Sequence, residues 1–213
     1  MRQLSLLDKL LCGLDTALRT IIVPKHRHST RINPAEGITE PSLSTDEKRH
    51  VAGLMRVNHA GEVCAQALYQ GQALTAKLTT VKEQMTEAAI EEVEHLAWCE
   101  QRLQELNNRP SVLNPLWYSS SLLLGALAGL AGDKWSLGFV AETERQVTAH
   151  LQRHLQHLPP HDIKTKAILT KMQDDEARHA DVAIAAGAAE LPFLIRKLMH
   201  TVSTLMTKSS YYI

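Results

Sequence analysis

Apolar residues recur at steps of three and four positions along most of the chain, which is the spacing that places side chains on one face of an α-helix. Few stretches alternate apolar with polar residues, as strands of a sandwich or barrel would. Long segments with helical spacing cover residues 46–79, 82–107, 136–158 and 161–188, and a shorter amphipathic one runs from Leu191 to Met206. Short connections near Thr80 and at Pro159-Pro160 predict two antiparallel hairpins, so the expected fold is all-α with a four-helix bundle.

A further amphipathic stripe lies ahead of these segments, within residues 1–22, and a basic cluster follows it. The stripe consists of Leu4, Leu7, Leu11, Leu14, Leu18 and Ile21, and the cluster of Lys25, His26, Arg27, His28 and Arg31. This combination is typical of a helix on an anionic membrane surface. The alternative is a helix packed on the domain, followed by a solvated basic loop. We divide the chain into an amphipathic N-terminal segment with its loop, 1–44, and a main domain, 45–213.

The stretch between the two predicted hairpins is unusual, because no residue from Pro110 to Gly132 is charged. It has the nominal length of a membrane-spanning helix, but Pro115 and the run from Ser119 to Ser121 shorten its apolar part to about a dozen residues. That length is typical of a buried helix, a crossover or an interfacial segment, and we expect partial immersion in a membrane. Small residues permit close helix packing or leave room for a slender apolar ligand; they are Gly125, Ala128, Gly129 and Gly132.

Composition narrows the classes of function. The chain has 213 residues, 44% of them hydrophobic, and 23 Lys and Arg balance 23 Asp and Glu. One domain with a packed core is expected, and the balanced charge offers no basic footprint for nucleic acid. The cysteines stand far apart, at Cys12, Cys64 and Cys99, so thiol-based zinc or redox chemistry is not expected. Asp8 and Lys9 interrupt the N-terminal leucines, which argues against a secretory signal and for a cytoplasmic protein.

Two Glu-x-x-His motifs, one in each predicted hairpin, carry the candidate chemistry. They are Glu92-Val-Glu-His95 and Glu176-Ala-Arg-His179. Residues three apart on a helix share a face, so the carboxylate and the imidazole of each motif can face one centre. The partner helix of each hairpin adds a single glutamate, Glu62 or Glu144. Two such motifs with two single glutamates match the bundle sites that hold two iron or two manganese ions.

All four of these glutamates lie on the apolar stripes of their helices, so their carboxylates should point inward. Buried anions need compensating cations, and two divalent ions nearly neutralise four carboxylates. Carboxylate oxygens with one imidazole for each ion suit iron or manganese, and we choose iron. Glu92 and Glu176 are the expected bridging ligands, and Glu62 and Glu144 the terminal ones.

Other acidic residues have simpler interpretations. Glu47 and His50 form a third Glu-x-x-His, but on the helix of Glu62 and about 18 Å from it, too far for a dinuclear pair. We interpret this motif as a solvated helix start. Glutamates on the polar side of the second long helix predict a wet surface; they are Glu87, Glu91 and Glu94.

Four histidines near the end of the third long helix look like a metal-binding stripe. Their neighbours are polar, so we expect His154, His157 and His161 at the surface. His150 is kept as a candidate residue beside the metal ligands.

The candidate ligands stand in longer motifs. These are Asn58-His-Ala-Gly-Glu62, Glu92-Val-Glu-His95, Arg109-Pro-Ser-Val-Leu-Asn-Pro-Leu-Trp117, Glu144 and Glu176-Ala-Arg-His179-Ala-Asp181. From about residue 46 onward the chain resembles the demethoxyubiquinone hydroxylase family, the di-iron monooxygenases of ubiquinone biosynthesis, and all six family ligands have a counterpart. Some members carry a tyrosine after the histidine matching His150. Leu151 stands there in this chain, so no redox role is carried over to that position.

The resemblance implies a ferritin-like bundle that holds two iron ions and is attached peripherally to the cytoplasmic side of the inner membrane. It implies hydroxylation of the ring of a prenylated methoxy-benzoquinol with dioxygen, and gives the apolar segment a use as membrane contact and substrate tunnel. Membrane lipid, the prenylated quinol and dioxygen are the expected partners. A complex with other ubiquinone-biosynthesis proteins, a homo-oligomer and the electron donor, either the quinol or a nicotinamide nucleotide, are left open.

Three other functions fit parts of the pattern. Iron storage or peroxide reduction, as in ferritins and rubrerythrins, uses the same bundle. Rubrerythrins, however, append a cysteine-rich iron domain, and a storage cage has little use for a long uncharged segment. A transfer RNA hydroxylase would need a basic surface. A metal-free, membrane-associated binding module would leave six ligand-type residues on apolar stripes unexplained.

Overall fold

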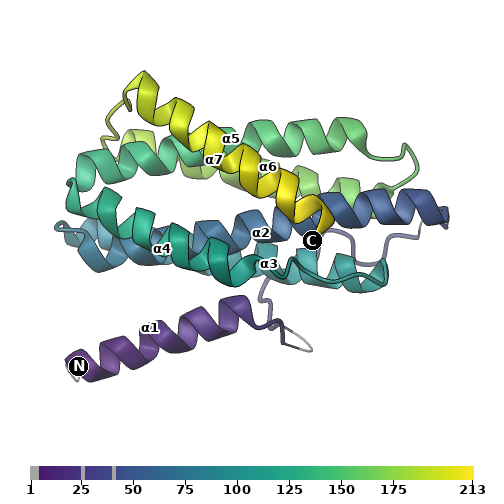
Figure 1. Ribbon diagram of the computed structural model, residues 1–213, viewed down its shortest axis with the longest axis horizontal. Coiled ribbons are helices and arrows are strands. Elements are labelled where there is room, and N and C mark those ends of the chain that lie inside the picture. The colour runs from purple at the N-terminus through teal and green to yellow at the C-terminus, as the bar shows by residue number, and fades with distance from the viewer. Residues whose placement is uncertain (1–4, 25–26, 40–41) are drawn as a thin grey trace.

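The computed structural model describes residues 5–24, 27–39 and 42–213, and within them the chain forms seven α-helices and no strand (Figure 1). The helices are α1 Leu6–Ile21, α2 Thr45–Thr75, α3 Thr79–Glu105, α4 Asn114–Leu130, α5 Asp133–His157, α6 Ile163–Ala185 and α7 Phe193–Tyr212. The all-α prediction is confirmed. The four long predicted segments correspond to α2, α3, α5 and α6, with bounds that differ by a few residues at each end.

Side chains at the helix starts explain where two of the helices begin. Glu47 N donates to Ser44 Oγ at 3.3 Å, and Ser44 N donates to the Glu47 carboxylate at 2.8 Å. This capping box starts α2, and the same arrangement starts α1. Glu47 is therefore used as a cap, while His50 Nδ1 lies 2.7 Å from the hydroxyl of Tyr211.

The bundle consists of two hairpins, α2 with α3 and α5 with α6, whose apolar faces meet. One core cluster includes Met55, Trp98, Leu103, Leu151 and Met172. A second includes Tyr69, Met85, Leu137, Val140 and Ala183. Because paired helices run in opposite directions, these clusters fill opposite ends of the bundle. The segments that carry the predicted ligands cross the middle, between the two clusters.

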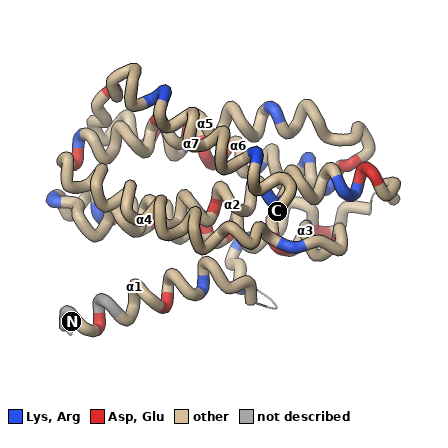
Figure 2. The backbone as a smooth tube through the Cα atoms, viewed as in Figure 1, with Lys and Arg blue, Asp and Glu red and all other residues tan. Residues whose placement is uncertain are grey.

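The uncharged segment forms α4, which packs along α2 and is free of Lys, Arg, Asp and Glu along its length (Figure 2). A Cβ atom added at Gly125 would overlap the backbone carbonyl of Leu68, and one at Gly71 would overlap that of Leu122. Of the two uses proposed for the small residues, close helix packing is therefore the one that Gly125 serves. Within the described part of the chain, the structure contains no helix of the length and apolarity needed to span a membrane.

The N-terminal helix α1 lies along the outside of the bundle (Figure 1). Its inner side packs through Ala17 and Ile21 against a cluster that includes Val63 and Tyr118. The outer leucines of the predicted stripe remain exposed; those described are Leu7, Leu11, Leu14 and Leu18. Packing on the domain thus applies to one side of the helix, and membrane contact of the other side stays a prediction. Leu4 lies outside the described residues.

The loop after α1 differs from the solvated basic loop that was predicted as the alternative. Arg27 forms an ion pair with Glu100 at 2.7 Å, and Arg31 forms one with Asp175 at 2.7 Å. The prediction was wrong for these two arginines because α3 and α6 present buried carboxylates to the loop, and no local pattern reveals such a contact. His28 is exposed, as the solvated loop would have it, and the remaining positions, Lys25 and His26, lie outside the described residues.

The C-terminal helix α7 extends beyond the predicted end at Met206. It crosses the bundle in contact with α5 and α2 (Figure 1). Arg56 Nη1 donates to the Tyr211 carbonyl at 2.6 Å, and Trp117 Nε1 donates to Ser210 Oγ at 3.1 Å. These bonds fix the last turn of α7 on the bundle.

Candidate metal centre

Four helices contribute carboxylates to one buried cluster in the middle of the bundle. The residues are Glu62 on α2, Glu92 and His95 on α3, Glu144 on α5, and Glu176 and His179 on α6. All six are buried, and the most exposed of them, His179, is only 7% exposed. The structure therefore brings together every residue that the sequence proposed as a ligand, although their binding of metal stays a prediction.

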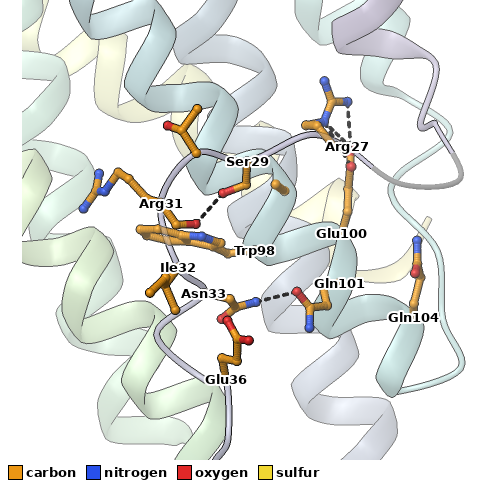
Figure 3. Close-up of a pocket in the computed structure, with 12 residues that line it drawn as sticks. Arg27, Ser29, Arg31, Ile32, Asn33, Glu36, Trp98, Glu100, Gln101 and Gln104 are labelled. Atoms are coloured by element: carbon orange, nitrogen blue, oxygen red, sulfur yellow. Dashed lines mark hydrogen bonds and ion pairs between the residues drawn. The ribbon is translucent and has the colours of Figure 1, made fainter.

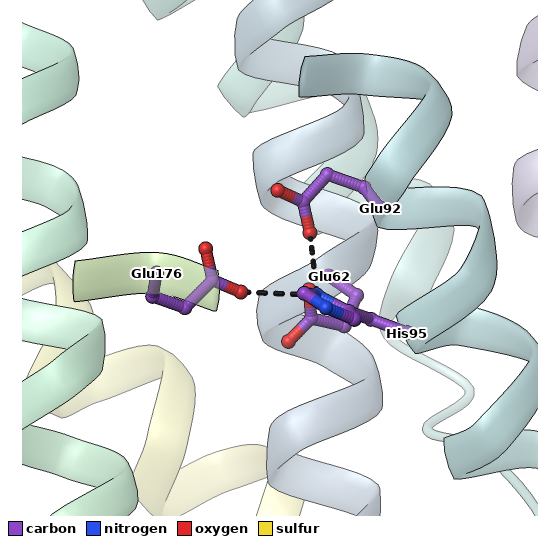
Figure 4. Close-up of side chains that lie close together, drawn as sticks. All are labelled: Glu62, Glu92, His95 and Glu176. Atoms are coloured by element: carbon purple, nitrogen blue, oxygen red, sulfur yellow. Dashed lines mark hydrogen bonds and ion pairs between the residues drawn. The ribbon is translucent and has the colours of Figure 1, made fainter. Parts of the chain in front are cut away.

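The atoms available to hold an ion form two groups, each within 4.8 Å, and the groups share one residue. The first group is Glu62, Glu92, His95 and Glu176 (Figure 4), and the second is Glu144, Glu176 and His179. Glu92 also faces both histidines, with Oε2 3.2 Å from His95 Nδ1 and Oε1 3.6 Å from His179 Nδ1. Glu92 and Glu176 thus lie between the two histidines, where a residue shared by two adjacent ions would have to be.

The carboxylates repel one another in the metal-free protein. Burial, with the charges of Glu176 and Glu62, raises the pKa of Glu92 well above its usual range, and burial with Glu176 and Glu92 does the same for the pKa of Glu144. Burial alone would lower the pKa of His179, but Glu176 and Glu92 outweigh it and raise that pKa to about 10. Protons therefore take the place of cations when no metal is bound.

An acidic residue that the sequence analysis did not assign to the site contacts the Nε2 atom of each histidine, on the side of the ring away from the cluster. Asp175 Oδ2 lies 3.2 Å from His95 Nε2, and Glu91 Oε2 lies 2.7 Å from His179 Nε2. A carboxylate at Nε2 keeps the proton there and leaves Nδ1 free to bind a metal. The sequence did contain a signal, because an acidic residue immediately precedes each Glu-x-x-His motif. Each reaches the histidine of the other motif.

The acidic stripe of α3 is not the wet surface that was predicted, apart from the exposed Glu87. Glu94 is only 5% exposed, accepts a hydrogen bond from Thr30 N at 2.9 Å and is also bonded by the Ser29 hydroxyl. Glu91 pairs with Arg178 as well as with His179. The prediction failed because the segment after α1 covers Glu94 and α6 pairs with Glu91, and the period of a single helix cannot show either contact.

The predicted surface histidines divide into two kinds. His157 is exposed and His161 is partly exposed. His154, in contrast, is only 8% exposed, so the surface prediction was wrong for this residue. The start of α2 covers this end of α5, where His50 Nε2 donates to the His157 carbonyl at 3.0 Å. The ring of His150 lies 3.9 Å from that of His154, centroid to centroid, and a place for His150 beside the metal ligands stays a prediction.

A cavity of about 150 Å³ adjoins the cluster, and its lining includes His179, Tyr69 and the apolar side chains of Leu137 and Val140. The Tyr69 hydroxyl donates to the Glu144 carboxylate. Burial and the neighbouring Glu144 raise the pKa of Tyr69 well above its usual range, so the phenol keeps its proton. Nothing in the spacing of Tyr69 distinguished it from an ordinary core aromatic residue, and the sequence analysis gave it no role.

The donor atoms of the cluster fit a bound metal ion. Glu92 Oε1 is buried and accepts no hydrogen bond from the described residues. Such an oxygen is costly to bury unless a cation or a proton satisfies it. Each group offers carboxylate oxygens and one imidazole nitrogen, the donor set that iron and manganese prefer over softer ions. The three cysteines are free thiols and none belongs to either group.

Comparison with known proteins places this geometry in context. A family model described as ubiquinone biosynthesis protein COQ7 matches residues 49–210. The chain is 67% identical to a protein of Legionella pneumophila (strain Corby) over 213 residues, which are 100% of both chains. It is 58% identical to one of Acinetobacter baylyi and 56% identical to one of Acinetobacter baumannii (strain SDF), again over 100% of both chains. All three relatives are named 3-demethoxyubiquinol 3-hydroxylase. These alignments include the N-terminal segment that precedes the match to the family model.

Proposed function

This chain belongs to the family of the ubiquinone biosynthesis protein COQ7, and on that basis we propose that it hydroxylates 3-demethoxyubiquinol with dioxygen at a centre of two iron ions. The reaction is that of its full-length relatives, a ring hydroxylation in ubiquinone biosynthesis. The observation that carries the proposal is the buried cluster of four glutamates and two histidines in two groups. A bundle alone does not fix a function, so the match along the whole chain is what favours hydroxylation over iron storage or peroxide reduction.

The proposed iron ligands are Glu62, Glu92, His95, Glu144, Glu176 and His179. We assign Glu92 and Glu176 as bridging ligands, because each lies close to both histidines. Glu62 and Glu144, each in one group only, are assigned as terminal ligands. Iron held by these residues would supply the activation of dioxygen, a reaction for which no protein side chain is suited.

The protein contributes orientation and a dry environment. Asp175 and Glu91 hold the Nε2 protons of His95 and His179, which aims both Nδ1 atoms at the glutamates. Tyr69 fixes one oxygen of Glu144. Burial of the cluster excludes water from the place where the ring is oxidised. The cavity beside His179 is a proposed route by which a small reactant such as dioxygen reaches the cluster.

We further propose that the protein is attached peripherally to the cytoplasmic side of the inner membrane. A prenylated quinol is too apolar to leave the bilayer readily, so its ring must be met at the interface. Three helices outside the bundle, α1, α4 and α7, carry large exposed apolar residues that support such an attachment. On α4 they include Leu116, Leu123, Leu127 and Leu130, and on α7 Phe193, Leu194, Leu198 and Leu205.

Iron content and product analysis test the proposed activity together. The Glu92→Ala and Glu176→Ala variants should each lose most of the bound iron, because each removes a residue shared by both ions. Neither should restore hydroxylation in a deletion strain, which should accumulate the demethoxy precursor. Glu47→Ala is the matched control, since it removes a capping glutamate from the decoy motif and should leave iron content unchanged. A deletion strain that makes normal ubiquinone would contradict the proposed reaction.

Removal of the metal tests the centre without reference to activity. Stripping should lower the melting temperature, because the binding free energy of the metal is lost and the protons that replace it must be taken up by buried carboxylates and histidines. Calorimetry of the protein with and without iron measures this difference. Equal melting temperatures would argue against a metal bound at the carboxylate cluster.

A further inference from the structure

The outer nitrogen of His95 begins a chain of contacts that leads out of the bundle. His95 Nδ1 faces the glutamate cluster, 3.0 Å from Glu176, while His95 Nε2 lies 3.2 Å from Asp175 Oδ2. Asp175 is itself buried, at 3% exposure. The same Oδ2 atom accepts from Arg31 Nη2 at 2.7 Å. Arg31 therefore sets the position of the carboxylate oxygen that orients His95.

Arg31 has a second contact that leads to the same histidine. Its guanidinium lies 4.9 Å from the centroid of the Trp98 ring, beside which it is seen in Figure 3. Trp98 is 1% exposed, and its ring centroid is 5.3 Å from that of His95. Arg31 thus touches two of the side chains that border His95, one by an ion pair and one by a cation–π contact.

The segment that carries Arg31 is itself fastened to α3. Glu94 accepts hydrogen bonds from Thr30 N at 2.9 Å and from Arg31 N at 3.3 Å. Arg27 pairs with Glu100 at 2.7 Å, an interaction visible in Figure 3. The two bonds to Glu94 place the Arg31 backbone independently of its side chain, and the guanidinium then reaches Asp175.

The acidic residue behind His179 has no such contact with the N-terminal segment. His179 Nε2 is held by Glu91, and Glu91 pairs with Arg178 at 2.6 Å. Arg178 belongs to α6, the helix of His179 itself. Cations of α6 also approach Asp175, but at its other oxygen, where Lys171 lies at 2.8 Å and Arg178 at 3.6 Å. Among the described residues, Arg31 alone pairs with a carboxylate behind a histidine from a segment that precedes the bundle and lies outside residues 49–210, the part matched by the family model.

We propose that Arg31 is a positioning residue of the metal centre, which acts through Asp175 and Trp98 to hold His95 in its metal-binding orientation. This inference rests on the proposed function, because it takes the cluster to be a metal centre. It gives the N-terminal segment a role in the chemistry in addition to any contact with a membrane. Without the guanidinium, Asp175 can turn toward Lys171, which lies 2.8 Å from its other oxygen, and His95 loses its fixed partner.

The test measures metal binding by the full-length, metal-free protein with Co²⁺ as the probe, using a competing chelator for affinity and visible absorption for coordination. Loss of a residue behind a ligand typically weakens metal binding 10–100-fold. Arg31 does not contact His95 itself but acts through Asp175, so we expect the lower end of this range. Arg31→Gln should lower the affinity for one of the two Co²⁺ ions by about tenfold and change the absorption band of that ion. Arg31→Lys keeps a positive charge beside Asp175 and should therefore retain most of the wild-type affinity.

The matched control is Arg27→Gln, which breaks the other arginine–carboxylate pair of the same segment but faces Glu100 rather than Asp175. It should lower the melting temperature to a similar extent and leave the affinity and absorption of Co²⁺ unchanged. The inference is overturned if Arg31→Gln binds Co²⁺ like the wild type, or if Arg27→Gln shows the same loss. Failure of the wild-type protein to bind Co²⁺ would instead overturn the proposed metal centre, and the inference with it.

Discussion

At the scale of single residues, the centre depends on side chains that satisfy one another across helices. Asp175 reaches His95, and Glu91 reaches His179, although each acidic residue belongs to the motif of the other histidine. Each hairpin therefore orients the histidine of the other, and the two motifs cannot work separately. Tyr69 on α2 has a similar relation to Glu144 on α5.

Replacement of Tyr69 by Phe removes the hydroxyl that fixes Glu144. We expect metal affinity to fall by about tenfold. This is the lower end of the range seen when a residue that hydrogen-bonds to a metal ligand is removed. Titration of the metal-free variant with Fe²⁺ under anaerobic conditions measures it. Tyr118→Phe is the control, because Tyr118 is equally buried but bonds to Gln70. Equal affinities of the Tyr69 and Tyr118 variants would refute the role given to the Tyr69 hydroxyl.

The buried histidine pair on α5 predicts sensitivity to acid. Burial lowers the pKa of His154 to about 2 and that of His150 to about 4, whereas an unfolded chain has a histidine pKa of about 6.5. Below that value the unfolded state binds protons that the folded state does not, so the stabilisation is complete above about pH 6.5 and is lost as the pH falls. The slope is about 1.4 kcal/mol per pH unit for each histidine.

His154→Leu should remove part of this slope. Urea unfolding of the metal-free protein at several pH values between 5 and 7 measures it, and the variant should lose less stability on acidification than the wild type. The exposed His200, changed to Gln, serves as the control and should keep the wild-type slope. A His154→Leu protein with the wild-type slope would show that this histidine is protonated in the fold.

At the scale of helices, glycine decides how closely α4 approaches α2. The backbones come so near at Gly71 and Gly125 that a side chain on either one would overlap a carbonyl of the other helix. The uncharged composition of α4 indicated an unusual segment. The sequence did not show which helix α4 packs against or which side of α4 faces outward, because small residues suit both close packing and an apolar channel. The contact with α2 decides both.

A pair of identical substitutions tests the helix contact. Gly125→Ala should destabilise the protein by about 1–3 kcal/mol, the usual cost of forcing an extra methyl group into a packed interface. Gly61→Ala is the control, because Gly61 lies within α2 with nothing within 4 Å of its added Cβ. It should stabilise the helix by about 0.5–1 kcal/mol. Denaturant unfolding should give the two variants opposite signs, and a shared sign would contradict the packing described for α4.

At the scale of the whole molecule, most of the large exposed apolar residues of the described chain lie on the three helices outside the bundle, and the others are scattered over the bundle helices and the connecting segments. The bundle encloses the cluster, while α1, α4 and α7 lie outside it and carry exposed leucines. Apolar surface of this extent on several helices marks an interaction site. The proposed metal centre and the proposed membrane face are therefore carried by different sets of helices.

Changing Leu123 and Leu127 together to Glu should weaken binding to vesicles of anionic phospholipid by at least tenfold, since burial of each leucine contributes about 1.5–3 kcal/mol. Both side chains are more than half exposed, at 61% and 53%, so the fold should tolerate the change. Sedimentation with vesicles measures the binding. The control is Ile90→Glu, at an exposed position of α3. Undiminished sedimentation of the double variant would exclude α4 from the membrane face.

Local and periodic features were predictable from the amino-acid sequence. The period of apolar residues predicted the four long helices, and the inward position of Glu62, Glu92, Glu144 and Glu176 followed from the same period. The bounds of the helices were less certain, because capping bonds such as that of Ser44 set them residue by residue. For these features, the neighbours along the chain carry the information.

Contacts between distant segments became known only from the folded arrangement. Glu94 had the spacing of a surface residue and proved to be the anchor of the segment after α1, while His154 was buried by the start of α2. The partners of Arg27 and Arg31 likewise lie on helices far along the chain. The physical reason is the same in each case. The exposure of a side chain and the residue that it pairs with depend on which segment packs against it. The spacing of apolar residues along its own helix does not show which segment that is.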